Sequence, residues 1–491
     1  MFSLPYFKYL FKSKKYFLLI IALLTILSAF TSSGGDKTLT YIVEILISIF
    51  VSYFLVINTF YYVHDKKAVD TFFSIPISRK AMLVTGLIFC TIVTFIPFAV
   101  GTYVFGLQES KFYEVTLFLL FALLGICALI CFNTSTYLLA NNSFDGIVMI
   151  GAYTVLPLMM YAVSNIFMNS YVCGLQSYDF DYFVYLSPIG MLAKMVVSSK
   201  RFYIPGWQTI AGFIVFLLAS LFVLNKEYIN RKVERASTPS DGIFTYPIII
   251  NVYVFIVLFL AASAYDYYYK DVWEFFGDYF IVYLLIFAIY VAAHFMHKRK
   301  FYMNFKLPLV FILITALTFG VGLLARNTNG FGLSQSYPKY DKTAEYQLNG
   351  YFYYEQNELA EYIKETNSED TIGYLYYSIG TDDWYKDREL KDSTVQIFEE
   401  IRQEAIKQFY ESNDKYLYMD FDSNINLSVN SKQNGKTKYY YYSVSGYYFR
   451  LDDLKTLASD PYIDVTFSTN YGDYKMKTDG TLVQVNSYIV E

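Results

Sequence analysis

Long apolar runs recur along the first two thirds of the chain, and short polar segments separate them. An apolar run of about 20 residues has the length of a helix that crosses the hydrocarbon core of a bilayer. The pattern predicts membrane-spanning helices, of which the fifth and seventh are the least regular because they are rich in Gly, Pro, Ser and Tyr. Nine ranges are expected: 16–32, 41–63, 81–105, 115–140, 145–168, 207–225, 245–266, 277–296 and 307–325.

The pattern after the last apolar run is that of a folded polar domain. "NELAEYIKET" and "STVQIFEEIRQEAIKQF" have the periodicity of amphipathic helices, whereas "YLYMDF", "KYYYYSVSGYYF" and "YIDVTFST" are typical of strands. The Asn-Gly pair in "QNGK" and the Asp-Gly pair in "TDGT" indicate tight turns between strands. We therefore expect residues 326–491 to form an independent α+β domain.

Composition agrees with a division into a membrane part and a polar part. The chain has 491 residues, of which 55% are hydrophobic and 17% charged, whereas soluble domains carry about 25% charged residues. Residues 331–491 have a net charge of −11 and residues 1–330 a net charge of +7, so two different environments are expected. No cysteine lies in the polar part, and Cys127 and Cys131 are interpreted as packing residues rather than metal ligands.

Lysine and arginine decide the expected orientation, because they are enriched on the cytoplasmic side of membrane proteins. With the N-terminus inside, the inner segments hold sixteen of these residues and the short outer loops hold six. We therefore expect a cytoplasmic N-terminus, and nine crossings place the C-terminal domain outside. The first run is expected to be a retained span rather than a cleaved signal. The outer segment 170–206 is expected to place one or two helices at the outer interface, the alternative being a disordered loop.

The segment "HDKKAVDTFFSIPISRKAMLV", which begins at His64, joins the second and third spans. Residues 68–73 can form a short helix that Pro76 would stop. Phe72 and Phe73 give this helix an apolar face, and Asp65, Lys66, Lys67 and Asp70 give it a charged one. Such an element suits docking onto a soluble partner. The alternative is a loop whose Lys and Arg only set the orientation, and the residues alone favour neither interpretation.

Two predicted cytoplasmic segments resemble a known family. "DTFFSIPISRKAMLVTGLI" is similar to the "LPxSRxxxxxxK"-like segment of ABC-transporter permeases of the type-2 exporter class, particularly the Ytr-like group of Gram-positive bacteria. "LNKEYINRKVERAST" resembles that group's "LYxxRKSExAG" segment. Six spans with a long outer loop before the sixth match the same layout. "VNSKQNGKTKYYYYSVSG" resembles the "lxNGkxxxRxY" hairpin of members with an extracellular tail, although Tyr replaces the Arg.

The resemblance implies a polytopic α-helical membrane protein of about nine spans with a type-2 ABC permease core and a C-terminal extracellular α+β domain. The implied domains are a cytoplasmic interfacial helix (1–15), the six-span core (16–225), a cytoplasmic linker (226–244), three additional spans (245–325) and the extracellular domain (326–491). The resemblance also assigns coupling to an ATPase to eight residues: Asp65, Lys66, Asp70, Phe73, Ser74, Pro76, Ser78 and Arg79. Residues Glu227, Arg231, Lys232 and Glu234 belong to the second cytoplasmic segment.

The sequence contains no "GxxxxGK[ST]" phosphate loop. We therefore expect ATP and Mg²⁺ to be used by separate ATPase subunits, with no cofactor or metal bound by this non-catalytic chain. The expected function is export or resistance to envelope stress and antimicrobial peptides. Expected partners are the ATPase, a second permease of the same or a related kind, the bilayer and an envelope-active peptide or lipid, but no nucleic acid. The alternatives are a signal-transmitting complex that moves no substrate, a membrane anchor without an ATPase and, last, a membrane enzyme.

Other polar residues leave alternatives open. Glu44 and Asn58, within the second span, are candidates for lining a translocation path, and so is Asp145 unless it caps its helix. The three histidines, His64, His294 and His297, are expected to pack at the inner boundary. The acidic turn "TDDWYKD" is expected to be solvated rather than to bind Ca²⁺. The tyrosines of the outer domain are strand formers or a peptide- or glycan-binding surface.

Overall fold

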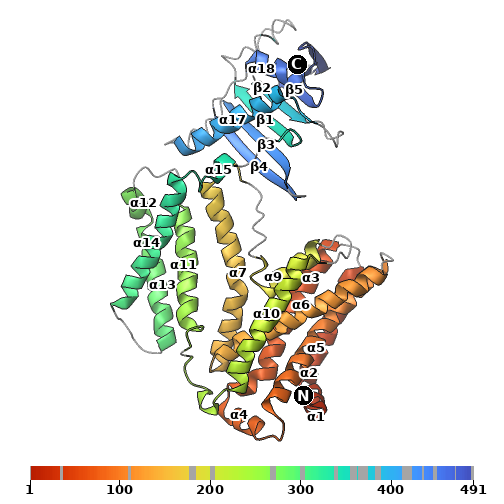
Figure 1. Cartoon of the computed structure of the whole chain (residues 1–491), viewed down its shortest axis with the longest axis vertical. Helices are drawn as coiled ribbons and strands as arrows, with labels where there is room; N and C mark the ends of the chain where they lie inside the picture. The colour runs from red at the N-terminus through yellow and green to blue at the C-terminus, as the bar shows by residue number, and fades with distance from the viewer. Residues whose placement is uncertain are drawn as a thin grey trace. The chain divides into compact units, whose positions relative to one another are not determined.

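The computed structural model is shown in Figure 1. It describes residues 2–33, 37–108, 112–175, 184–198, 205–240, 242–265, 272–298, 305–336, 341–353, 362, 374–381, 389–411, 423–433, 436–445, 450–469 and 472–487. The chain folds into two compact units. The first comprises Met1–Ala162, Phe180–Ile256 and Phe287–Leu307, and the second comprises Val163–Asp179, Val257–Ile286 and Pro308–Glu491. The five domain ranges expected from the sequence stay predictions.

Within the described residues, eight helices are long and apolar enough to cross a membrane. They are α3 (Lys37–Phe60), α5 (Arg79–Gln108), α6 (Phe112–Leu139), α7 (Ser143–Tyr171), α10 (Trp207–Leu224), α11 (Tyr246–Ser263), α13 (Phe280–Lys298) and α14 (Lys306–Asn327). These eight confirm the second to ninth apolar segments predicted from the sequence.

The first predicted span is a special case. It corresponds to α2 (Lys15–Ser33), which follows α1 (Leu4–Ser13) at a bend of 76°, and it qualifies as a ninth span only when the two helices are taken together. Helix α1 is amphipathic, because Tyr6 and Leu10 are buried while Lys8 and Lys12 are exposed. This pattern is that of the predicted interfacial helix.

The core of the first unit lies among α3, α5 and α6. Helix α5 packs against α2, α3 and α6, and α10 packs against α6. Val51, Leu55, Phe89, Ile126 and Leu129 are among the side chains with no exposed surface in this core. In contrast, only 22% of the most apolar 18-residue stretch of the span that contains α10 is buried inside the protein. The outward side of α10 therefore has the character of a lipid-facing surface.

The described part of the predicted outer segment contains α9 (Pro188–Ser198). Met191 and Val196 of this helix are fully buried, and α9 packs against α3, α6 and α10. This part of the segment is thus a packed helix, not a disordered loop.

The second unit contains a seven-stranded antiparallel sheet of order β4-β3-β1-β2-β5-β6-β7. The strands are β1 (Glu345–Tyr353), β2 (Tyr374–Thr381), β3 (Ser423–Gln433), β4 (Lys436–Ser445), β5 (Ile463–Thr469), β6 (Gly472–Met476) and β7 (Leu482–Ser487). Helices α17 (Asp392–Glu411) and α18 (Leu451–Ala458) cover one face, as Figure 1 shows. The predicted α+β character of this domain is confirmed. The short helices α12 (Val272–Asp278) and α15 (Leu333–Ser336) complete the unit.

Apolar residues alternate with more polar ones along the strands, so that one face of the sheet can be buried. Leu348, Ile379, Leu427 and Val465 are fully buried beneath the helices, whereas their sequence neighbours point to the other face. The predicted Asp-Gly turn joins β6 to β7, and Gly480 has φ of +83°, a conformation that favours glycine. At the predicted Asn-Gly turn, Gln433 pairs with Lys436. The predicted helix "NELAEYIKET", the strand "YLYMDF" and the acidic turn "TDDWYKD" lie outside the described residues, apart from Tyr362 and Thr381.

Candidate functional site

The helix predicted after His64 is present as α4 (Lys66–Phe73). Asp65 caps it, because its Oδ1 accepts the backbone N–H groups of Lys67 at 2.9 Å and Ala68 at 3.4 Å. These two donors would otherwise lack partners at the helix N-terminus. The helix ends at Phe73, and Pro76 follows where a further turn would need a backbone donor. Local sequence therefore fixes both ends of α4.

Aromatic contacts hold the inner face of α4. Phe72 stacks on Tyr62, which lies in the 3-10 turn η1 (Tyr61–Val63) after α3, with ring centroids 4.3 Å apart. Phe73 stands edge-on to Tyr228, at 6.1 Å, in the π-helical turn η2 (Asn225–Ile229) after α10. The hydroxyl groups of Tyr62 and Tyr228 share a hydrogen bond. Consequently α4 rests on the ends of two long helices.

Arg79 joins the two segments that the sequence predicts to be cytoplasmic. Its guanidinium lies over the Phe73 ring, 4.1 Å from the centroid. Nη1 donates to the backbone carbonyls of Ile229 at 3.3 Å and Arg231 at 2.9 Å. The side chain expected to contact a partner therefore turns inward in this structure and positions α4.

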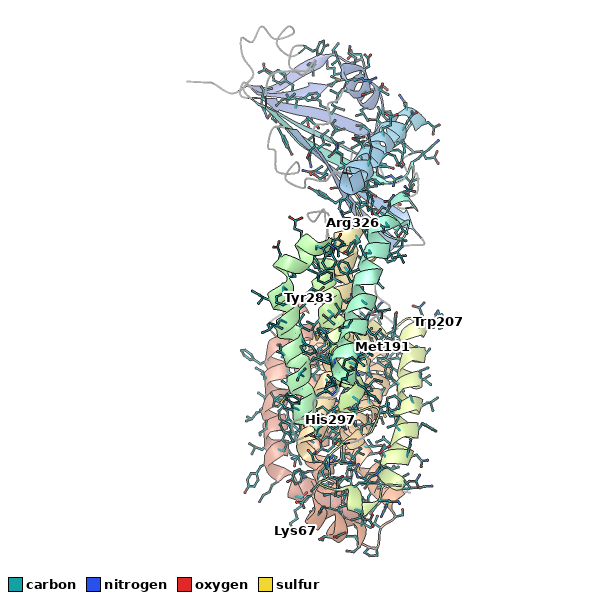
Figure 2. All side chains as sticks on the ribbon, turned by 90° about the vertical axis from the view of Figure 1, so that its left-hand side faces the viewer. Lys67, Met191, Trp207, Tyr283, His297 and Arg326 are labelled. Atoms are coloured by element: carbon teal, nitrogen blue, oxygen red, sulfur yellow. The ribbon has the colours of Figure 1, made fainter. Side chains whose placement is uncertain are left out.

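The eight predicted coupling residues lie together on one short stretch, in two groups. Asp65, Phe73 and Arg79 are half-buried and make the contacts just described. The other five are exposed, and we call them the α4 surface: Lys66, Asp70, Ser74, Pro76 and Ser78. The exposed Lys67 lies beside them, and Figure 2 shows it at one end of the first unit. The α4 surface can thus be reached by another protein without unfolding the element.

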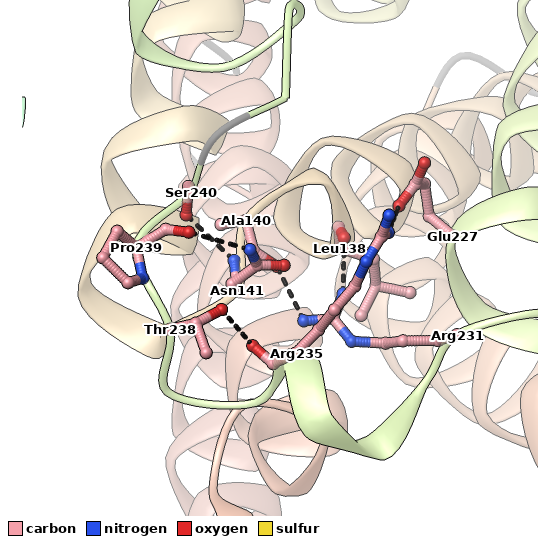
Figure 3. A network of polar contacts seen from close by, with 9 residues as sticks. All are labelled: Leu138, Ala140, Asn141, Glu227, Arg231, Arg235, Thr238, Pro239 and Ser240. Carbon is pink, nitrogen blue, oxygen red and sulfur yellow. Dashed lines mark hydrogen bonds and ion pairs between the residues drawn. The ribbon is translucent and has the colours of Figure 1, made fainter.

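Arg231 caps the C-terminus of α6, although it lies more than 90 residues further along the chain. Its side chain is 3% exposed, and Nη1 and Nη2 donate to the carbonyls of Leu138 and Ala140, each at 2.9 Å (Figure 3). These carbonyls belong to the acceptors that a helix leaves unpaired at its C-terminus, where a positive charge is also favourable. Burial lowers the pKa of Arg231 to about 10, so the guanidinium remains charged at neutral pH.

His64 lies at the centre of the same region. Its ring is 3% exposed and stands edge-on to Tyr137, at 4.5 Å between centroids. Its carbonyl accepts a hydrogen bond from Oγ of Ser237 at 2.9 Å. Burial, and then the charge of Arg231, lower the pKa of His64 to about 3, although the backbone of Asn141 and Tyr137 opposes the shift. The imidazole is therefore neutral at physiological pH.

Asp145 is a second anchor, at the start of α7. Asn142 caps this helix, because its Oδ1 accepts the N–H of Asp145 at 2.8 Å. The carboxylate of Asp145 in turn accepts hydrogen bonds from the hydroxyl groups of Ser240 at 2.7 Å and Tyr246 at 2.9 Å. The cap is therefore Asn142, whereas Asp145, in the first turn of α7, fixes residues 236–240 and 242–245, which we call the strap.

Some of these roles were visible in the sequence and others were not. The string "NNSFD" at residues 141–145 has the spacing of a helix cap, with a side-chain acceptor three residues before an acidic residue. No local signal reveals that Ser240 completes the contact, because it lies 95 residues away. For the same reason, sequence patterns do not identify Arg231 as the residue that caps α6.

Glu44 lies in α3 and is 1% exposed. Its Oε2 accepts a hydrogen bond from Oγ1 of Thr102 in α5 at 3.1 Å, and Oε1 has no partner among the described residues. A Cβ at Gly101 would collide with this carboxyl and with the Ser28 hydroxyl, so the glycine makes room for both. Glu44 therefore faces protein rather than lipid, and its part in a translocation path stays a prediction.

Asn58 has a different environment. Its backbone and side-chain oxygens accept two hydrogen bonds from Nζ of Lys14, at 2.7 and 2.8 Å. Lys14 marks the bend between α1 and α2, so Asn58 holds that bend. About 21 Å of helix separates Asn58 from Glu44 at 1.5 Å per residue, and the structure does not bring the two together.

The described residues contain no group of three or more His, Cys, Asp or Glu side chains able to hold a metal ion. His297 is 6% exposed in α13 and lies near Tyr246, at 5.2 Å between ring centroids.

Comparison of the chain with protein-family models, curated proteins and solved structures finds no match.

Proposed function

We propose that the chain is the membrane-spanning permease subunit of an ABC exporter of the type-2 class, and that a separate ATPase presses on the α4 surface. One observation carries the proposal. The α4 surface is exposed, while Phe72, Phe73 and Arg79 fix the other side of the element to the ends of α3 and α10. An exposed surface on a firmly supported element suits the transfer of mechanical work.

The polar contacts around α4 support this mechanism. Arg231 joins the segment after α10 to the end of α6. Ser237 joins the strap to His64, just before α4, and Asp145 joins the strap to α7. Hydrogen bonds that involve charged groups each contribute about 1.5–3 kcal/mol. A displacement of α4 is therefore expected to move the ends of several helices together rather than to deform α4 alone. ATP and Mg²⁺ would be bound only by the partner.

The test uses the complex that an affinity-tagged chain retains from its native membrane, reconstituted in lipid vesicles. Pro76→Asp places a charge on the α4 surface without touching the buried face. We expect it to lower the ATP hydrolysis of the complex at least fivefold while the tagged chain stays folded. Pro461→Asp is the matched control, because Pro461 is exposed in the second unit, and it should leave hydrolysis unchanged. Equal hydrolysis in both variants, or an intact tagged chain that retains no ATPase, contradicts the proposal.

A second candidate is a complex that transmits a signal and moves no substrate. The observation that favours it is the attachment of the end of α7 to strand β4 and helix α17 of the C-terminal domain. The backbone N–H of Tyr441 in β4 donates to the carbonyl of Gly174 at 2.8 Å. The hydroxyl of Tyr410 in α17 donates to the backbone carbonyl of Tyr171, also at 2.8 Å. Helix α7 begins at the Asp145 contacts, so one helix carries both sets. Efflux of a fluorescent amphipathic peptide from vesicles that hold the intact complex separates the candidates, because only an exporter moves it.

A further inference from the structure

A groove of about 470 Å³ lies beside the strap in the first unit. The turn after α6 provides Asn141, η2 provides Lys226 and Glu227, the 3-10 turn η3 (Val233–Arg235) provides Arg235, and the strap provides Thr238 and Phe244. Asn141 fixes the strap here, because its backbone N–H donates to Oγ of Ser240 at 2.9 Å and its Nδ2 donates to the carbonyl of Pro239 at 3.0 Å (Figure 3). The groove therefore has a rigid wall.

The charge of the lining favours an anion. Lys226 and Arg235 are exposed cations, and Glu227 is the single carboxylate among the described residues of the lining. Arg235 approaches Glu227 at 3.5 Å through Nη1 while 55% of the arginine side chain stays exposed. A guanidinium has five N–H donors in a planar arrangement that matches phosphate oxygens. Most of the donors of Arg235 are thus available to a ligand.

The rim of the groove is apolar and exposed. Ile243 and Phe244 in the strap are 75% and 61% exposed, and Phe222, one turn before Lys226 in α10, is 75% exposed. Exposure of such an apolar surface to water is unfavourable, whereas contact with lipid chains removes it from water. The groove therefore lies where the apolar surface of α10 meets two cations, which is where a phospholipid changes from chain to headgroup.

We propose that this groove binds an anionic phospholipid, with the phosphate between Lys226 and Arg235 and the acyl chains against Ile243 and Phe244. Basic pockets at the ends of membrane helices are suited to anionic headgroups. The apolar rim distinguishes a lipid from a free phosphate, which would gain nothing from Ile243 and Phe244. The inference goes beyond the proposed function, because it requires a membrane but neither an ATPase nor transport.

The test counts phosphatidylglycerol molecules bound to the purified full-length protein by native mass spectrometry, in a detergent that also contains phosphatidylcholine. The double variant K226Q/R235Q is expected to lose at least fivefold in occupancy. The control K66Q/K67Q removes the same charge from α4 and should bind as the unchanged chain does. Glu227→Gln should raise the occupancy, because it removes the carboxylate that repels the headgroup.

Two further arms distinguish other occupants. Phe244→Ser should weaken phosphatidylglycerol but not glycerol 3-phosphate, and an equal effect on both would assign the groove to free phosphate compounds. If K226Q/R235Q binds phosphatidylglycerol normally but no longer retains an ATPase, the groove is a protein-docking surface and the lipid proposal is wrong. Unfolding temperatures of all variants, measured without added lipid, identify any that fail to fold. For those, the conservative change Arg235→Lys replaces the double variant and should reduce occupancy less.

Discussion

The imidazole of His64 shows how its surroundings fix the charge of a single residue. In the unfolded chain a histidine is protonated below a pKa of about 6.5, whereas in the folded protein burial and Arg231 lower the pKa to about 3. Between these values the unfolded state binds more protons than the folded state. The free energy of unfolding therefore falls as the pH drops below 6.5, and this loss is complete only below the folded pKa.

We predict that His64→Leu makes the protein less sensitive to acid. Each pH unit below 6.5 costs the unchanged chain up to about 1.4 kcal/mol through this group, and leucine fills a similar space without titrating. Chemical unfolding at pH 7 and pH 5 would measure the effect in both chains. The carboxylates titrate alike in both, so the difference isolates His64. An identical loss in the two chains would mean that His64 is protonated in the folded state.

At the scale of an element, the end of α6 depends on a side chain from elsewhere. We predict that Arg231→Met lowers the free energy of unfolding by about 1–3 kcal/mol, because two buried carbonyls lose their donors. The comparison is Arg235→Met, whose ion pair is exposed and screened by solvent, so its cost should stay below about 0.5 kcal/mol. Thermal unfolding in detergent without added lipid would measure both. Equal costs would show that Arg231 does not cap the helix.

Helix α4 shows how far local sequence determines an element and its contacts. The ends of α4 were predictable because Asp65 and Pro76 act within a few residues. The inward turn of Arg79 was not, because its acceptors lie 150 and 152 residues away. In the second unit, alternation predicted β5 and most of β4, but β1 and β2 were missed and the strand order was out of reach. That order depends on pairing between distant segments, which no local pattern encodes.

At the scale of the whole molecule, the number of crossings determines which parts share a side of the membrane. Seven of the apolar helices in the described residues lie between α4 and the C-terminal sheet: α5, α6, α7, α10, α11, α13 and α14. If all seven cross, their odd number requires α4 and the sheet to lie on opposite sides, whatever the bent pair of α1 and α2 does. That pair decides only the side of the N-terminus. If α2 crosses, α2 and α3 return the chain to the side of α1.

Single cysteines introduced at exposed positions would test this topology with a maleimide that cannot cross membranes. Thr478→Cys, in the turn between β6 and β7, is expected to react on intact cells. Thr71→Cys on α4 and Lys12→Cys on α1 should react only after the membrane is opened. The unchanged chain is the control, since Cys90, Cys131 and Cys173 are buried and Cys127 is half-buried.

Each labelling outcome has its own consequence, because the three positions depend on different helices. Labelling of Thr71→Cys on intact cells would place the α4 surface where no ATP is hydrolysed, and the proposed coupling would be wrong. Labelling of Lys12→Cys on intact cells, with Thr71→Cys protected, would mean that α2 lies along the surface instead of crossing. The proposed coupling would survive that result, because it requires only that the α4 surface lies inside, which the protection of Thr71→Cys would show.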